Sequence, residues 1–275
     1  MYEATPIVNG FPGKTQTHGS FGWSSVWLLQ GFDRVIMVET GPPSYVPLIT
    51  AALSRIGLST ADVTDVLVTH AHWDHLGNVS LFPQARRWIG RTEYEWALSR
   101  APDEPFVSQP LLGALSRPEG LLRLVDSDGN LFAGVRAHEV SGHTPGHLAF
   151  AVETTAGPML FVGDAAKNIH ELDSICVDSA LDRMLGAQSV SRIHELVRRT
   201  GAVVVPGHDV ACELTDQGWR RRSEQRAEIQ FFHKGNAPPA RISLSDAKPD
   251  PVVVEACSPE REIPRPSLHR QASAE

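Results

Sequence analysis

The sequence is short of cysteine. Its 275 residues include only Cys176, Cys212 and Cys257, which lie far apart and are odd in number. This spacing excludes a disulfide framework and a CxxC zinc motif. We therefore expect reduced thiols, as in a cytoplasmic protein.

Long apolar runs and an excess of basic charge are also missing. No stretch is apolar for long enough to cross a bilayer, and the start lacks the basic and apolar regions of a signal peptide. The formal charge is −7, whereas nucleic-acid binding requires clustered basic residues. We expect neither a membrane nor a nucleic-acid partner, and a small molecule as the substrate.

What the sequence has is a regular succession of short apolar strands and amphipathic helices. Period-two or fully apolar runs predict strands, and apolar residues at helical spacing predict helices. We expect strands over 25–30, 34–39, 65–69, 87–89, 121–125, 135–140, 148–153, 159–162 and 202–205, and helices over 44–56, 92–99 and 189–199. The two halves of the chain repeat this pattern of strands followed by helices, which predicts an α/β sandwich with two sheets inside and helices outside.

The composition changes near residue 235. Seven of the twenty prolines lie beyond it, and such a tail is typically extended or disordered. We predict one folded domain over 1–234 and a tail over 235–275, with a helix over 219–232 before the tail. The apolar stretch PVVVEA at 251–256 could pair as an edge strand or dock on a partner subunit, which leaves a homodimer through the tail open.

The stretch VTHAHWDHLGN, residues 68–78, is the most informative part of the chain. His70, His72, Asp74 and His75 crowd into six positions directly after the apolar strand predicted at 65–69. A sharp turn there would bring all four side chains around one small volume. Imidazole nitrogens and carboxylates are ligands that zinc and similar divalent cations accept.

Three more candidate ligands occupy the same structural position, after an apolar strand. They are His143 in VSGHTPGH, Asp164 in LFVGDA and His208 in VVVPGHD. A glycine precedes each of them, which lets backbone approach a bound ion closely. Strand ends that converge on one rim of a sandwich, each with its ligand, are what a pocket for two metal ions requires.

HxHxDH followed by a lone histidine, an aspartate and a final histidine resembles the metallo-β-lactamase superfamily of metallohydrolases, over about 20–214. The resemblance implies an αββα sandwich and two metal sites. One would use His70, His72 and His143, the other Asp74, His75 and His208, with Asp164 bridging both. It implies two Zn²⁺ per chain, with Mn, Co or Fe as alternatives.

Such a centre implies a hydrolase in which two cations share a hydroxide near neutral pH, oriented by Asp74, and polarise the substrate carbonyl. Within the superfamily the chain looks most like the acyl-homoserine lactonases, through the segment RTEYE at 91–95. Those lactonases place a tyrosine three residues after the bridging aspartate, where this chain has Lys167. Lys167 can donate a hydrogen bond and adds a positive charge, so we predict that it faces the pocket and favours an anionic substrate or leaving alkoxide.

Several alternatives stay open. A glyoxalase-II-like thioesterase shares the histidine motif and has a basic helical region, which 219–234 could imitate. A persulfide-oxidising enzyme would hold one iron on the equivalents of His70, His143 and Asp164 together with another histidine. An exported β-lactamase and a ribonuclease-Z-like nuclease fit the composition less well. His147 is expected to support the loop by hydrogen bonding, and Phe106 and residues 111–115 either line an apolar groove or pack in the core.

Overall fold

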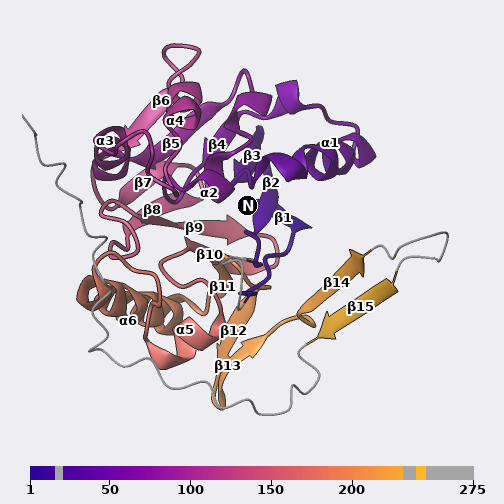
Figure 1. Ribbon diagram of the computed structural model, residues 1–275, viewed down its shortest axis with the longest axis vertical. Coiled ribbons are helices and arrows are strands. Elements are labelled where there is room, and N and C mark those ends of the chain that lie inside the picture. Colours follow the sequence, from indigo (N-terminus) through magenta and orange to yellow (C-terminus); the bar gives the residue numbers. More distant parts are fainter. Residues whose placement is uncertain (16–20, 232–239, 246–275) are drawn as a thin grey trace, which may run out of the picture.

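Two β-sheets pack face to face, and helices cover both outer faces (Figure 1). The computed structural model describes residues 1–15, 21–231 and 240–245, and all structural statements below concern these residues. The layers are therefore helix, sheet, sheet and helix, which confirms the predicted α/β sandwich.

The first sheet holds the strands of the N-terminal half in sequence order. Its strands are β1 (Glu3–Val8), β2 (Val26–Gly31), β3 (Arg34–Val38), β4 (Asp65–Leu67), β5 (Arg86–Gly90) and β6 (Leu122–Val125). β1, β2 and β3 are joined antiparallel, whereas β3, β4, β5 and β6 run parallel. The carboxyl ends of the four parallel strands thus lie at one edge of the sheet.

The second sheet is built from the C-terminal half in the order β13-β12-β11-β10-β9-β8-β7. Its strands are β7 (Gly129–Phe132), β8 (Val135–Glu139), β9 (Leu148–Thr154), β10 (Gly157–Gly163), β11 (Val203–Pro206), β12 (Cys212–Thr215) and β13 (Gly218–Arg221). β9 is antiparallel to both β8 and β10, and β10 is parallel to β11. β8, β10 and β11 therefore point the same way and end at the same rim.

Alternation along the strands explains why the sheets pack in this way. On β3, Ile36 and Val38 face the other sheet, whereas Met37 faces the outer helices. On β10, Phe161 lies in the core between the sheets and Leu160 in the core beneath the helices of the second half. Side chains of a strand point alternately to opposite faces. A fully apolar strand therefore contributes side chains both to the core between the sheets and to the core beneath the helices.

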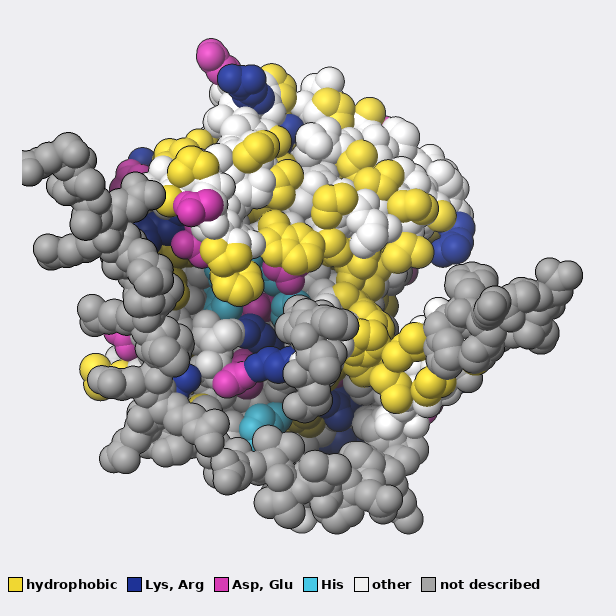
Figure 2. All heavy atoms as spheres, viewed as in Figure 1, with side chains coloured by type: hydrophobic (Ala, Val, Ile, Leu, Met, Phe, Trp, Pro, Cys, Tyr) yellow, Lys and Arg dark blue, Asp and Glu magenta, His cyan; other side chains and the backbone are white. Residues whose placement is uncertain are grey.

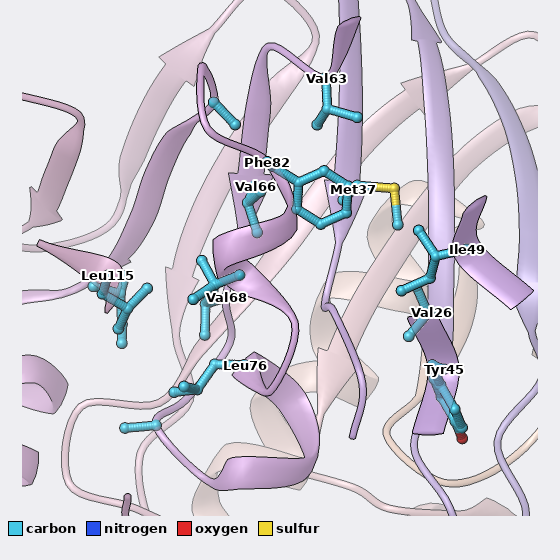
Figure 3. Close-up of a cluster of buried hydrophobic side chains, with 14 of the residues drawn as sticks. Val26, Met37, Tyr45, Ile49, Val63, Val66, Val68, Leu76, Phe82 and Leu115 are labelled. Atoms are coloured by element: carbon cyan, nitrogen blue, oxygen red, sulfur yellow. The ribbon is translucent and has the colours of Figure 1, made fainter. Parts of the chain in front are cut away.

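Helices close the two outer cores. Those of the first half are α1 (Val46–Arg55), α2 (Trp73–Leu76), α3 (Arg91–Leu98) and α4 (Gln109–Leu115), with short 3₁₀ turns at Pro43–Tyr45, Thr60–Asp62 and Val79–Leu81. Figure 3 shows Ile49 of α1 beside Met37 and Val26 of the sheet, and Leu76 of α2 beneath Val68, which follows β4. The second half adds α5 (Ile169–Ser174) and α6 (Arg183–Thr200).

The helix expected over 219–232 is wrong. Strand β13 occupies its start, and β14 (Arg226–Phe231) occupies its end. β12 and β13 form a hairpin closed at Gly218, whose φ of +101° suits glycine. The apolar strand predicted at 202–205 is consequently not the last of its sheet, because pairing across this hairpin outweighs the helical propensity of a sequence rich in Arg, Glu and Gln.

β14 pairs antiparallel with β15 (Ala240–Ser245), a two-stranded sheet that stands apart from the sandwich in Figure 1. Part of the predicted tail therefore forms a strand. The boundary expected at 234/235 and the PVVVEA stretch lie outside the described residues, so the domain division and the homodimer stay predictions.

Cys212 is a free thiol buried in the sheet, as expected, whereas Cys176 is disulfide-bonded, which corrects the expectation that all thiols are reduced. Among the described residues, no helix has the length and apolar character needed to cross a membrane.

Candidate metal centre

All seven predicted ligands meet at the rim where the parallel strands of both sheets end. His70 follows β4, and α2 begins directly after His72, which turns the chain so that Asp74 and His75 face back toward it. The remaining three side chains come from the second sheet, where His143 follows β8, Asp164 follows β10 and His208 follows β11. The structure therefore brings together every residue that the sequence singled out.

Three groups of ligand atoms lie close enough to surround a cation. His70, His72 and His143 form the first set, and Asp74, His75 and His208 form the second set. The third group, His70, His75 and Asp164, takes one histidine from each set and joins them. Within each set the ligand atoms lie within 4.8 Å of one another. In the first set, Nε2 of His143 lies 3.1 Å from Nδ1 of His72. In the second set, Nε2 of His208 lies 3.4 Å from Oδ2 of Asp74.

Asp164 stands between the two sets. Its Oδ1 lies 3.3 Å from Nε2 of both His75 and His208. Its Oδ2 lies 3.5 Å from Nε2 of His143. One carboxylate thus presents a different oxygen to each set, which is the arrangement expected of a bridging ligand.

The buried polar atoms of the centre favour cation binding. Nε2 of His70, both ring nitrogens of His75 and Oδ1 of Asp164 are buried without a hydrogen-bond partner among the described residues. Unpaired buried polar atoms are costly. A divalent cation would satisfy them, and the imidazole and carboxylate donors are of the kind that zinc and related ions accept.

Electrostatics point the same way. Burial lowers the pKa of His70 and His143 well below the usual value, and lowers that of His72 to about 4, so these rings are neutral ligands at physiological pH. Burial also opposes charge on His75, but the carboxylates of Asp74, Asp164 and Glu39 outweigh it and raise the pKa of His75 well above the usual value. The carboxylates around His75 therefore stabilise positive charge in the second set.

Glu39 is a site residue that the sequence reasoning missed. It follows β3, is buried, and lies with Oε2 3.5 Å from Nδ1 of His75. Its Oε1 accepts a hydrogen bond of 3.0 Å from the backbone N–H of Thr69, next to His70. A carboxylate directly after a buried strand at the ligand-bearing rim was the available signal.

Glu93, inside the RTEYE segment, is a second buried carboxylate at the centre. Its Oε1 accepts a hydrogen bond of 2.9 Å from the backbone N–H of Ala71, and its Oε2 one of 3.0 Å from Gly146. Burial raises the pKa of Glu93 to about 7, although these hydrogen bonds act in the opposite direction. No sequence pattern distinguished this glutamate from the exposed Glu95 beside it.

His147 supports the loop as predicted, because its Nε2 accepts a hydrogen bond of 3.1 Å from the backbone N–H of Asp164. Two buried aspartates near the centre bind residues other than the ligand histidines. Asp65 accepts hydrogen bonds from Arg34, Arg86 and Trp88. Asp209 binds Arg221, Gln225 and the Ile169 N–H, and so anchors the loop that carries His208.

The backbone of Lys167 is held at the edge of the centre by two hydrogen bonds. Its backbone N–H donates to Oε2 of Glu171 at 2.7 Å, and its carbonyl accepts from the N–H of His208 at 2.7 Å. The half-buried side chain contributes a positive charge that helps to lower the pKa of His72 and His143. The same charge also lowers the pKa of Asp178 and acts against the raised pKa of Glu171, so the ammonium is within electrostatic reach of the first set and of these two carboxylates.

Apolar side chains border the centre next to His72. Figure 2 shows histidines and carboxylates in a hollow below a group of hydrophobic side chains, with Lys and Arg side chains beside them. Trp73 and Phe106 are exposed, and the ring of Phe106 lies 5.5 Å from that of His72. Leu112 and Leu115 are buried, so the predicted apolar run packs in the core while Phe106 is free to contact a substrate.

The family model of the metallo-beta-lactamase superfamily matches residues 20–208. The match covers more than half of the chain and includes all seven residues of the centre. The chain therefore belongs to the metallo-β-lactamase superfamily.

Curated relatives include N-acyl homoserine lactonases. The chain is 28% identical over 162 residues to N-acyl homoserine lactonase AiiA of Bacillus thuringiensis subsp. kurstaki, a match that covers 58% of this chain and 62% of the relative. It is 30% identical over 167 residues to N-acyl homoserine lactonase AttM of Azorhizobium caulinodans, covering 58% and 63%. The matches thus span less than two thirds of these relatives.

A solved structure supports the fold. It is a variant of AiiA from B. thuringiensis with N-decanoyl-L-homoserine bound at the active site, and it superposes with a TM-score of 0.61 at 23% identity. The match covers 76% of this chain and 93% of the other.

Proposed function

We propose that this protein is a dinuclear metal-dependent hydrolase that opens a lactone or a related ester bond. The observation that carries the proposal is the position of Asp164, whose two oxygens face the histidines of two different ligand sets. The lactonase relatives support the choice of bond, and the seven side chains fit zinc as the cation.

The residues of the chain divide the work. Two divalent cations, when bound, would make a water nucleophilic near neutral pH and polarise the substrate carbonyl. Asp74 lies at the open side of the second set, partly exposed, where its carboxylate can accept a proton from the attacking water and orient it. Lys167 can donate a hydrogen bond to the carbonyl oxygen or to the leaving alkoxide.

The apolar border accounts for an acyl substrate. Trp73 lies between His72 and Asp74, and its backbone N–H donates to the backbone carbonyl of Phe106 at 3.0 Å, so the two segments that carry these exposed aromatic residues are joined beside His72. Their exposed faces can cover an acyl chain while the ester group reaches the centre.

The alternatives lose support. The thioesterase interpretation depended on a basic helix over 219–234, but strands occupy 218–221 and 226–231. A single-iron enzyme would leave Asp74, His75 and His208 without a purpose, although the structure gathers them into a complete set.

The test is hydrolysis of a panel of acyl lactones, aryl esters and thioesters, followed with a pH indicator, on protein whose bound metal has been quantified. We expect lactone turnover with two metal ions per chain, loss with a chelator and recovery with Zn²⁺. Protein that binds two metal ions but turns over thioesters alone would overturn the choice of bond. Protein that binds no metal ion would overturn the proposal as a whole.

A further inference from the structure

Glu93 is the third residue of α3, and its carboxylate is fully buried. Its two oxygens accept hydrogen bonds from two different loops, at the N–H groups of Ala71 and Gly146. Ala71 lies between His70 and His72, and Gly146 follows His143 by three residues. The side chain therefore joins the two loops that together make the first set.

The backbone at the start of α3 packs closely against the His143 loop. A Cβ atom on Gly146 would lie 2.0 Å from the backbone nitrogen of Glu93, and one on Gly90 would lie 2.4 Å from the carbonyl oxygen of Gly146. The start of α3 thus touches the loop of His143 directly. The backbone at the start of α3 therefore cannot move toward the His143 loop without displacing it.

The second set has a carboxylate of its own. Glu39 contacts His75 and the N–H of Thr69, as described above. None of the hydrogen bonds of Glu93 reaches Asp74, His75 or His208, so Glu93 contacts the loops of the first set alone, whereas Glu39 contacts His75 of the second set and the Thr69 N–H beside His70.

We propose that Glu93 is a positioning residue that sets the cation affinity of the first set, by holding the His70–His72 loop and the His143 loop in register. The inference rests on the proposed function, because it requires that the two sets bind cations. Glu93→Gln is the matching variant. Glutamine has the same shape but one acceptor oxygen and one NH₂ group, so it keeps one backbone hydrogen bond and turns the other into a contact between two donors.

We expect Glu93→Gln to weaken binding at the first set about 10- to 100-fold and to leave the second set unchanged, as other supporting residues of metal ligands do. The measurement is calorimetric titration of the metal-free full chain with Zn²⁺, together with ¹¹³Cd NMR of the cadmium-loaded chain. In the spectrum, the signal lost in His143→Ala identifies the first set, and that signal alone should weaken or shift in Glu93→Gln.

Glu171→Gln is the matched control. Glu171 is also buried and also accepts backbone hydrogen bonds from two segments, at Lys167 and Asp178, but it does not contact the first set. We expect the Zn²⁺ affinity of the first set in Glu171→Gln to equal that of the wild-type chain. Glu39→Gln, unlike Glu93→Gln, should weaken the second set, because it removes the carboxylate beside His75.

The outcomes separate the two proposals. If wild type binds two cations and Glu93→Gln binds both with unchanged affinity, the role of Glu93 is overturned while the hydrolase proposal stands. If wild type binds no cation, the proposed function fails first. Should Glu93→Gln not fold, amide hydrogen exchange of metal-free wild type decides the matter. Slow exchange at Ala71 and Gly146 supports the link, and exchange at the rate of an exposed loop contradicts it.

Discussion

A Cβ atom on Gly207 would lie 2.0 Å from Oδ1 of Asp164. The glycine before His208 therefore leaves the space that the central carboxylate occupies, and the two loops can approach only because this side chain is absent.

Gly207→Ala is expected to displace Asp164 and lower kcat/KM for the best lactone about 100-fold, because a displacement of about 1 Å has that order of effect at an active site. Metal content should fall below two ions per chain. Kinetics and metal analysis of the purified variant check this.

Gly113→Ala is the control for that experiment. Gly113 lies in α4 with nothing within 4 Å of its added Cβ. It should keep full activity and gain about 0.5–1 kcal/mol of stability, since alanine is favoured over glycine inside a helix. Wild-type kinetics in Gly207→Ala would show that the carboxylate has more freedom than the packing implies.

Lys167 is expected to select for charge. Lys167→Gln keeps a hydrogen-bond donor but removes the cation, so kcat/KM for an ester that carries a carboxylate should fall about 10- to 100-fold, the worth of one charge-assisted hydrogen bond. A neutral ester of the same size should lose far less. Equal losses on both esters would contradict a preference for anions.

Lys14→Gln provides the matched change of net charge. Lys14 is exposed and already forms an ion pair with Asp178. Its removal should have less effect on the anionic ester than the loss of Lys167, and an equal effect would assign the preference to the general charge of the mouth.

Cys212 links stability to alkaline pH. Burial, together with the charge of Asp209, raises the pKa of this thiol from 9.0 to about 12. A raised pKa in the folded state means that its stabilising contribution is complete below pH 9 and is lost as the pH rises toward 12. The full difference corresponds to about 4 kcal/mol.

Denaturant unfolding of wild type and Cys212→Val between pH 8 and 11 checks this expectation. The valine variant lacks the thiol but keeps an apolar side chain of similar size. The stability of wild type should fall relative to that of the variant above pH 9, and parallel curves would refute the linkage.

Removal of metal should destabilise the fold. Each proposed set takes ligands from both sheets, so cations bind the folded chain and not the unfolded one. Cations present at about 100 times their dissociation constant contribute about 2.7 kcal/mol, and chelation should therefore lower Tm by about 5–10 °C. Thermal unfolding with and without chelator measures the shift. A His143→Ala/His208→Ala double variant, which interrupts both sets, should show little change.

The ligands were predictable because each follows an apolar strand, and strand ends of one direction meet at one rim. The same rule would have found Glu39, which follows the strand Arg34–Val38. Glu93 obeys a different logic. It lies in a short helix, and only its packing against Gly146 separates it from Glu95, which the structure leaves exposed.

The C-terminal third shows where sequence reasoning fails. Residues 219–232 are rich in good helix formers, yet Trp219 and Arg220 pair with Leu214 and Glu213 across a hairpin. A partner strand outside the window decided their conformation, and local propensity carries no information about such a partner.

The division of each ligand set between the two sheets has a further consequence. The last strand of the first sheet ends at Val125 and the first strand of the second sheet begins at Gly129, so over the strands of residues 3–8 and 26–221 the chain passes from one sheet to the other at a single point, between β6 and β7. Each half alone carries an incomplete site. Two fragments cut between β6 and β7 would hold no cation tightly until they reassociate. Metal binding would then stabilise the reassociated pair, and tight binding would show that the fragments have come together. In that sense the centre belongs to neither half, and it exists only as a property of their junction.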